Sequence, residues 1–172
     1  MVKIILCILI IIAGIAAGHL KARTYENRVL HLQDLITTIK ILESEMKYRL
    51  DPLPEIFIKI SGMKISLAGR LFETTSRLLR EDFAHDFANC WNQAVELVYK
   101  DSSLTRADKQ VLSDLGIELG KTDMGSQYSL FSRAYTLLDA QVAEAAEEKR
   151  TKGKMYKSLG TAVGVLVVIL LV

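Results

Sequence analysis

Two carboxylates and a phenol that lie close together are the first groups in this sequence that could do chemistry. Glu43, Glu45 and Tyr48 fall within six residues, and paired carboxyl groups can act as general acid and base when their pKa values are driven apart. Neighbouring positions on a helix point in different directions, however, and no nearby feature would tune either pKa. Lys40 and Lys47 also stand three residues before and four after Glu43, the spacing of ordinary helical pairs. We therefore expect Glu43 to be structural.

The histidines and cysteines do not form a recognisable metal or redox motif. His19, His31 and His85 are scattered, and none has another histidine or a cysteine three or four residues away. Cys7 lies in an apolar run and Cys90 stands beside a tryptophan, which gives neither a disulfide framework nor metal spacing. A reducing compartment fits this usage, and we expect no metal.

The known catalytic and nucleotide-binding motifs are also missing. The sequence contains no glycine-rich phosphate loop, GxSxG, HExxH or CxxC, and its GIELG string at 116–120 falls in a helical pattern rather than after a strand. The net charge is +2, from 22 basic and 20 acidic side chains, which gives no nucleic-acid footprint. The sequence therefore predicts a protein that is not an enzyme, binds no cofactor and contacts no nucleic acid.

An uncharged apolar run stands at each end of the chain. Ile4 to Gly18 and Ser158 to Val172 are fifteen residues each, and a helix begun at Met155 covers 18 residues, or about 27 Å. Both approach the length that spans a bilayer. We predict an N-terminal transmembrane helix over residues 1–22, a cytosolic helical domain over 23–154 and a C-terminal transmembrane helix over 155–172.

Basic residues flank both runs on the side of the central domain. They are Lys21, Arg23 and Arg28 after the first run, and Lys149, Arg150, Lys152, Lys154 and Lys157 before the second. The positive-inside rule then places the central domain in the cytosol. The alternative is that Lys3, the apolar stretch 4–12 and the small residues 13–18 form a cleaved signal peptide, which would leave a secreted, tail-anchored domain.

Each run carries two glycines four residues apart, Gly14 with Gly18 and Gly160 with Gly164. This spacing allows close helix contact in lipid, so the two spans, which would run antiparallel, could pair within one chain. The alternative is that glycine is common in membrane helices and the spacing arose by chance.

The central part reads as a series of amphipathic helices. The first continues from the apolar run to about residue 50, with apolar positions at spacings of three and four. Asp51 and Pro52 predict a stop, with Asp51 capping a short helix over 52–61 that Gly62 breaks. Later helices follow over about 65–79, 83–98 and 105–120, where Thr105 and Asp108 predict a capping box.

The last helix begins after Asp123, which we expect to cap it, and continues through Gly153 into the second apolar run. No strand-like alternation occurs. The fold class is therefore predicted to be all-α, a compact bundle of about six helices whose first and last helices extend into the membrane.

Large aromatic side chains follow one helical face in the region 83–98, and this stripe could line a ligand pocket or fill a core. Phe83, Phe87 and Trp91 have the spacing of a buried helix face, which is more often core. Gly116 inside a helix costs about 1 kcal/mol against alanine, so it marks close packing. We expect Trp91, Gly116 and Gly120 to be helix-packing positions.

The junction before the second apolar run resembles a known family. The string KMYKSLG, formed by Lys154, Met155, Tyr156, Lys157, Ser158, Leu159 and Gly160, is similar to the C-terminal signature of the stage III sporulation protein AB family of endospore-forming bacteria. The resemblance covers the whole chain in order, with LESE at 42–45, Tyr48, Trp91 and LGIELG followed by TD at 115–123 as further matches. Asp51 where threonine is common, and the added Pro54, are two departures.

This resemblance implies a structural part of the secretion-like apparatus that joins mother cell and forespore, lodged in the mother-cell membrane that faces the forespore. The family looks like the cytoplasmic domain of inner-membrane platform proteins of type II secretion and type IV pilus systems. The implied partners are a sporulation secretion-type ATPase and other stage III sporulation membrane proteins, and a homo-oligomer is compatible with the resemblance. The alternative is a membrane-anchored helical regulator that binds a small ligand or a partner helix.

Overall fold

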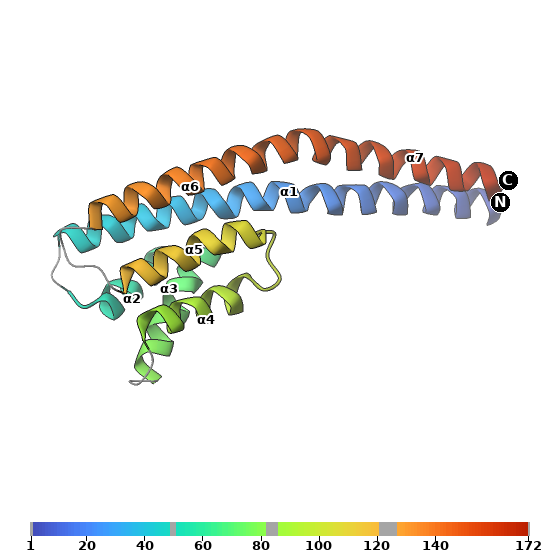
Figure 1. Cartoon of the computed structure of the whole chain (residues 1–172). Coiled ribbons are helices and arrows are strands. Elements are labelled where there is room, and N and C mark those ends of the chain that lie inside the picture. The colour runs from blue at the N-terminus through green and yellow to red at the C-terminus, as the bar shows by residue number, and fades with distance from the viewer. Residues whose placement is uncertain (1, 49–50, 82–85, 121–126, 172) are drawn as a thin grey trace. The chain divides into compact units, whose positions relative to one another are not determined.

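The protein is built from helices joined by short connections (Figure 1). The computed structural model describes residues 2–48, 51–81, 86–120 and 127–171, and no strand occurs among them. The prediction of an all-α fold is confirmed.

The first helix, α1, is one uninterrupted element from Val2 to Tyr48. It contains no proline, and its two glycines fall in the apolar first half, so nothing in its sequence breaks the backbone ladder. Residues of α1 belong to two compact units. We call Met1–Val29 with Ala143–Val172 the paired-helix unit, and Leu30–Val142 the bundle unit.

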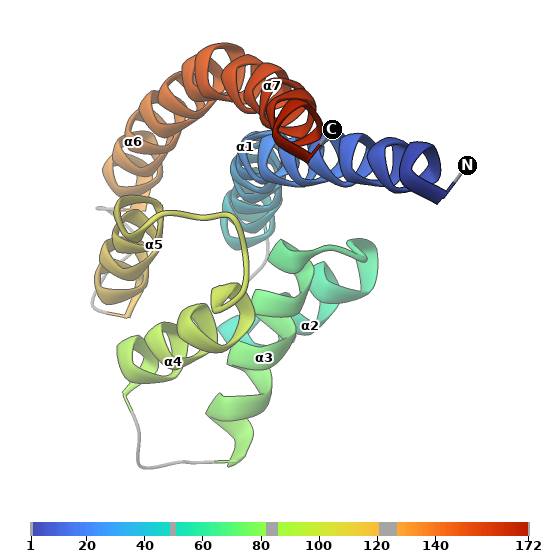
Figure 2. The ribbon, with the colours of Figure 1, turned by 90° about the vertical axis from the view of Figure 1, so that its right-hand side faces the viewer.

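The bundle unit adds shorter helices to the second part of α1. They are α2 (Leu53–Met63), α3 (Leu67–Glu81), α4 (Phe87–Tyr99), α5 (Arg106–Leu119) and the first part of α6 (Gln127–Glu148). Consecutive helices from α2 to α5 pack against one another, as Figure 2 shows.

Local sequence explains where several of these helices begin. Thr105 and Asp108 form the predicted capping box at the head of α5, with the Asp108 backbone N–H donating to the Thr105 hydroxyl and the Thr105 N–H to the Asp108 carboxylate. The prediction for α2 is wrong in detail. Pro52, not Asp51, occupies the N-cap position, without a side-chain cap bond, and its carbonyl accepts from the backbone N–H groups of Glu55 and Ile56.

Two further expectations about helix ends have different outcomes. Gly62 does not end α2, which continues to Met63 because glycine alone lowers helix stability without blocking the backbone ladder. The predicted cap at Asp123 lies outside the described residues, as do Phe83 and His85.

The core of the bundle unit is made of apolar side chains from every one of its helices. Those without exposed surface include Leu32, Leu35, Ile39, Leu42, Phe57, Ile60, Leu71, Phe72, Trp91, Ala94, Leu112 and Leu138. Four of the positions on α1 repeat at spacings of three and four, which is the stripe that the sequence predicted.

The paired-helix unit contains the first part of α1, the end of α6, a π-helical turn η1 (Lys149–Gly153) and α7 (Lys154–Leu171). The α7 helix runs alongside the first part of α1 (Figure 1). Large apolar side chains on both helices face outward, among them Leu9, Leu20, Leu166 and Ile169. Such surfaces are stable in lipid rather than in water.

Within the described residues, α1 is the helix that is long and apolar enough to cross a membrane, in its segment Leu6–Tyr48. The second span, over residues 155–172, stays a prediction.

Candidate functional site

The four glycines of the apolar runs lie at the contact between α1 and α7. A Cβ atom added at Gly14 would stand 2.7 Å from the Gly160 carbonyl oxygen, and one added at Gly160 would stand 2.6 Å from the Gly14 oxygen. A Cβ on Gly18 would meet the Tyr156 oxygen at 2.6 Å, whereas one on Gly164 would keep 3.3 Å from its nearest atom, the Ile11 Cα. The two backbones therefore touch at Gly14, Gly18 and Gly160, where only glycine fits.

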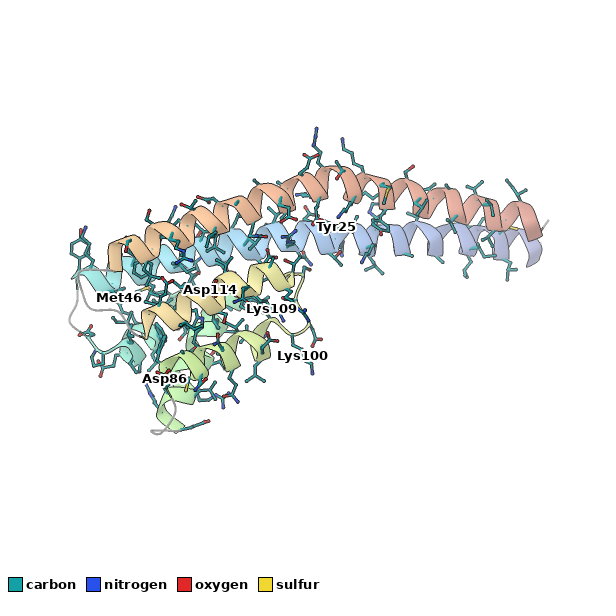
Figure 3. The ribbon with its side chains drawn as sticks, in the orientation of Figure 1. Tyr25, Met46, Asp86, Lys100, Lys109 and Asp114 are labelled. Atoms are coloured by element: carbon teal, nitrogen blue, oxygen red, sulfur yellow. The ribbon has the colours of Figure 1, made fainter. Side chains whose placement is uncertain are left out.

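Tyrosines lie next to this glycine contact. Figure 3 shows Tyr25 on α1 where it faces the chain segment that leads into α7. The Tyr25 ring stacks on Tyr156 with centroids 5.9 Å apart, and Lys21 Nζ stands 5.9 Å from the centre of the Tyr156 ring. Partial burial and the nearby Tyr156 phenol raise the pKa of Tyr25.

Next along the chain from Tyr25, a buried arginine forms part of an ionic cluster. Arg28 is only 3% exposed, and its guanidinium donates to Glu148 at 2.7 Å and to Glu144 at 3.3 Å. Lys152 donates to the second oxygen of Glu148. The hydrogen bond from Lys152, followed by the one from Arg28, lowers the pKa of the Glu148 carboxyl. In the sequence alone, Arg28 is only an orientation signal, because helical spacing links residues within one helix and not across 116 to 120 positions.

The remaining residues of the KMYKSLG segment have different surroundings. Lys154 and Lys157 are exposed, and they form no ion pair within the described part of the chain. Met155 and Leu159 are each 51% exposed. Ser158 lines an apolar groove along the outer face of α7. The functional importance of this segment as a unit stays a prediction.

The carboxylates considered for catalysis do not converge on one point. Glu43 accepts a hydrogen bond from the Tyr135 hydroxyl at 2.6 Å, while Glu45 pairs with Lys59 at 2.6 Å. Tyr48 is 78% exposed. The expected pairing of Glu43 with lysines is wrong, because α6 brings a phenol within reach.

Lysines near Glu43 contact aromatic rings instead. Lys40 Nζ stands 5.7 Å from the centre of the Tyr135 ring, and Lys47 Nζ stands 5.8 Å from that of Tyr48. Burial and the hydrogen bond to the Glu43 carboxylate raise the pKa of the Tyr135 phenol. Tyr135 therefore stays protonated at neutral pH and acts as a donor, with no sign of acid or base function.

Trp91 has no exposed surface and lies against α5. Its indole N–H donates to the Leu112 carbonyl at 2.7 Å, and a Cβ added at Gly116 would meet the Trp91 Cδ1 atom at 2.0 Å. A Cβ at Gly120 would stand 3.1 Å from the Phe87 ring. Trp91 also contacts Phe57, Phe72 and Phe87 with ring centroids 5.6 to 6.1 Å apart. These aromatic side chains pack against one another in the described part of the bundle core.

The described histidines and cysteines differ in their burial. His19 is exposed, and burial lowers the pKa of the half-buried His31. Cys90 is buried and Cys7 partly so, and neither forms a disulfide. Within the described residues, no three His, Cys, Asp or Glu side chains are grouped so that they could hold a metal ion.

An open polar cleft of about 460 Å³ lies between α4 and α5. Charged and amide side chains line it, including Glu96, Arg106, Lys109 and Gln110, above the apolar Val95 and Leu104. Figure 3 marks Lys109 on α5. Arg106 is exposed and has no ion-pair partner among the residues that the structure describes.

These features define a class: an all-helical, membrane-associated protein in which the helix leading from the apolar N-terminus also enters a filled helical bundle. The sequence model of the family described as stage III sporulation protein AB matches residues 3–172. The chain belongs to this family, which confirms the resemblance seen in the sequence. Its role is in sporulation, and its family is not one of enzymes.

Individual relatives agree with this assignment. Stage III sporulation protein AB of Bacillus subtilis (strain 168) is 30% identical over 172 residues, which cover 99% of both chains. A solved structure of stage III sporulation protein AB is similar with a TM-score of 0.67 and 26% identity, over 73% of this chain and 98% of that chain.

Proposed function

We propose that the chain is a non-enzymatic platform subunit of the secretion-like complex between mother cell and forespore. Its bundle unit lies in the cytosol and contacts a secretion-type ATPase, and its apolar helices contact other stage III sporulation membrane proteins. The membrane is that of the mother cell, on the side that faces the forespore. Family membership supports the sporulation part of this proposal.

The observation that carries the platform role is the kind of cavity that the bundle unit offers. A regulator that binds a small ligand needs an interior pocket with converging polar groups. Among the described residues, the core of the bundle unit is instead filled by aromatic and aliphatic side chains, and a polar cleft lies on the outside, between α4 and α5. An outward cleft with charged walls suits a partner protein.

Arg106 is the side chain of this cleft that is best placed to contact a partner. It is exposed at the first position of α5 and has no ion-pair partner in the described part of the chain. Lys109, one turn later, is held 3.4 Å from Glu96 across the cleft. An acidic group on the partner would therefore meet Arg106 first.

The contact is tested by co-purification of the full-length, tagged chain with the ATPase. We expect Arg106→Glu to lower the recovered ATPase at least tenfold, since one reversed charge at a contact costs about 1.4 kcal/mol or more. Arg77→Glu on α3 is the matched control, because Arg77 is 57% exposed and lies outside the cleft. Equal recovery with both variants would remove the cleft from the proposed interface.

The role in the cell and the orientation need separate tests. Deletion of the gene should stop development after engulfment, and normal spores without it would refute the platform role. For the orientation, a single cysteine is placed at the exposed Asp101 in a chain whose Cys7 and Cys90 are alanine. Modification of that cysteine by an impermeant reagent in intact cells would refute a cytosolic bundle unit.

A further inference from the structure

A second cleft, with basic walls, lies in the paired-helix unit beside the π-helical turn. It has a volume of about 280 Å³, and its lining includes Lys149, Arg150, Lys154 and Lys157 together with the acidic Glu26. This volume is about nine times the ~30 Å³ share of one water molecule. The cleft therefore has room for a small polar group and carries an excess of positive charge.

The bottom of this cleft is open. Gly153 is buried, yet a Cβ atom added there would meet nothing within 4 Å. Ala22, on the facing part of α1, is 5% exposed and has only a methyl group to offer. These two small residues leave space that larger side chains would have filled. The space lies at the π-helical turn η1, and π-helical turns are frequent at functional sites.

The charges of the cleft are only partly balanced by the protein itself. Lys149 pairs with Glu26 at 3.2 Å, and Arg150 pairs with Glu147 at 2.9 Å. Lys154 and Lys157 have no such partner among the described residues. Two ammonium groups are therefore available to an anion that enters the cleft.

The position of the cleft along the chain indicates which anion it would meet. The uncharged run of α7 begins directly after Lys157, and the run of α1 ends just before Lys21. Tyr156 and Tyr25 stack at the same level, and tyrosine is typical of the boundary between hydrocarbon and water. A basic cleft at this boundary lies where phospholipid headgroups are found.

We propose that this cleft binds the phosphodiester headgroup of an anionic phospholipid, with Lys154 and Lys157 as its charge partners and Gly153 as its floor. The lipid tails lie along the outward apolar side chains that share a face of α7 with Lys154, such as Val165 and Ile169. The site holds the chain at a fixed depth and favours membranes rich in anionic lipid. This inference does not depend on the platform role.

The test uses the full-length protein, stripped of lipid in a neutral detergent, and follows its melting temperature during titration. The probes are dioctanoyl phosphatidylglycerol, dioctanoyl phosphatidylcholine and inorganic phosphate. We expect saturable stabilisation by phosphatidylglycerol alone, because a ligand that binds the folded state raises its stability. Equal stabilisation by phosphatidylcholine, or by phosphate without lipid, would overturn a site for an anionic headgroup.

Variants locate the site. We expect Lys154→Gln to weaken the apparent affinity for phosphatidylglycerol at least tenfold, and Gly153→Leu to do the same by filling the open floor. Arg23→Gln is the matched control, since Arg23 is an exposed basic residue near the same boundary but not part of the cleft.

The control separates a site from a general attraction of charges. Equal weakening by Arg23→Gln and Lys154→Gln would show diffuse attraction and overturn the proposal. Unchanged affinity in Lys154→Gln, or in a Gly153→Leu variant with intact helical signal, would do so as well. Lys154 is exposed, so Lys154→Gln should fold even if Gly153→Leu does not. Its affinity for phosphatidylglycerol then still decides whether the cleft is the site.

Discussion

Gly116→Ala addresses a close contact between α5 and the Trp91 ring in the core of the bundle unit. The new methyl group would stand 2.0 Å from Cδ1 and 2.5 Å from Cγ of the Trp91 ring. Non-bonded carbon atoms in favourable contact are about 3.5 to 4.0 Å apart. The indole must therefore move by more than 1 Å, although it has no exposed surface and three aromatic rings around it.

The expected loss of stability follows from three contributions. Overpacking of a filled core costs about 1 to 3 kcal/mol. If the displaced ring loses its 2.7 Å hydrogen bond to the Leu112 carbonyl, a further ~1 to 3 kcal/mol is lost. Alanine stabilises a helix over glycine by about 1 kcal/mol, which offsets part of this. We expect a net destabilisation of about 1 to 5 kcal/mol.

Two measurements on the full-length protein in detergent check this result. Thermal unfolding followed by far-ultraviolet circular dichroism should shift downward by about 2 to 4 °C for each kcal/mol. Trp91 is the only tryptophan, so its emission reports the displacement directly and should move to longer wavelength. Gly62→Ala in α2 is the control, since a Cβ there meets nothing within 4 Å and should leave stability equal or higher.

A double variant separates the clash from other causes. Replacing Trp91 by alanine removes Cγ, Cδ1 and Nε1, the atoms that the new methyl group meets. Trp91→Ala should therefore lose stability alone, but adding Gly116→Ala should cost this variant much less than it costs the parent. Additive losses in the double variant, or unchanged melting of Gly116→Ala alone, would refute the packing argument.

Three further predictions concern the paired-helix unit. Gly160→Leu should push α1 and α7 apart, because a Cβ at this position stands 2.6 Å from the Gly14 oxygen, whereas Gly164→Ala should change the interhelical distance little. Distances between spin labels on the two helices measure this change, and equal shifts in the two variants would contradict the prediction. Arg28→Ala should destabilise the unit by about 1 to 3 kcal/mol, since it removes a buried side chain and its charge-assisted hydrogen bonds to Glu148 and Glu144, and a melting temperature like that of the parent would contradict this. The pKa of Glu148 is lowered in the folded state, so the stabilisation from its ionised carboxylate is present above the unfolded pKa of about 4.5 and is lost as the pH falls below that value. Glu148→Gln should abolish this part of the dependence of the melting temperature on acid pH. An unchanged acid profile in the variant would refute the prediction.

Local signals predict the helices of the bundle unit and one of its caps. Thr105 and Asp108 stand three residues apart, so their reciprocal bonds depend only on the backbone between them. The same reasoning failed for Glu43, where it favoured lysines on the same helix. Its partner, Tyr135, lies 92 positions away, and only the packing of α6 on α1 brings the two together. Patterns within one helix cannot encode which residue of another helix arrives opposite.

The glycine spacing shows an intermediate case. The pairs Gly14 with Gly18 and Gly160 with Gly164 indicate a helix face that tolerates close approach, but not which pair meets which. The structure places Gly160 against both Gly14 and Gly18, while Gly164 has looser surroundings. The difference depends on the register of α7 along α1, a quantity that involves both helices at once.

Arg28 and Lys154 show why a count of basic residues near an apolar run is a poor guide to their use. The positive-inside rule uses both residues only as signals of orientation and treats every positive charge alike. Burying a guanidinium is costly unless carboxylates compensate it, so Arg28, held by two glutamates, is part of the packing of its unit. An exposed ammonium such as that of Lys154 has no such role and keeps its charge available. The basic flank of α7 thus combines structural and available charges, and removing one of each should lower stability in the first case and lipid affinity in the second.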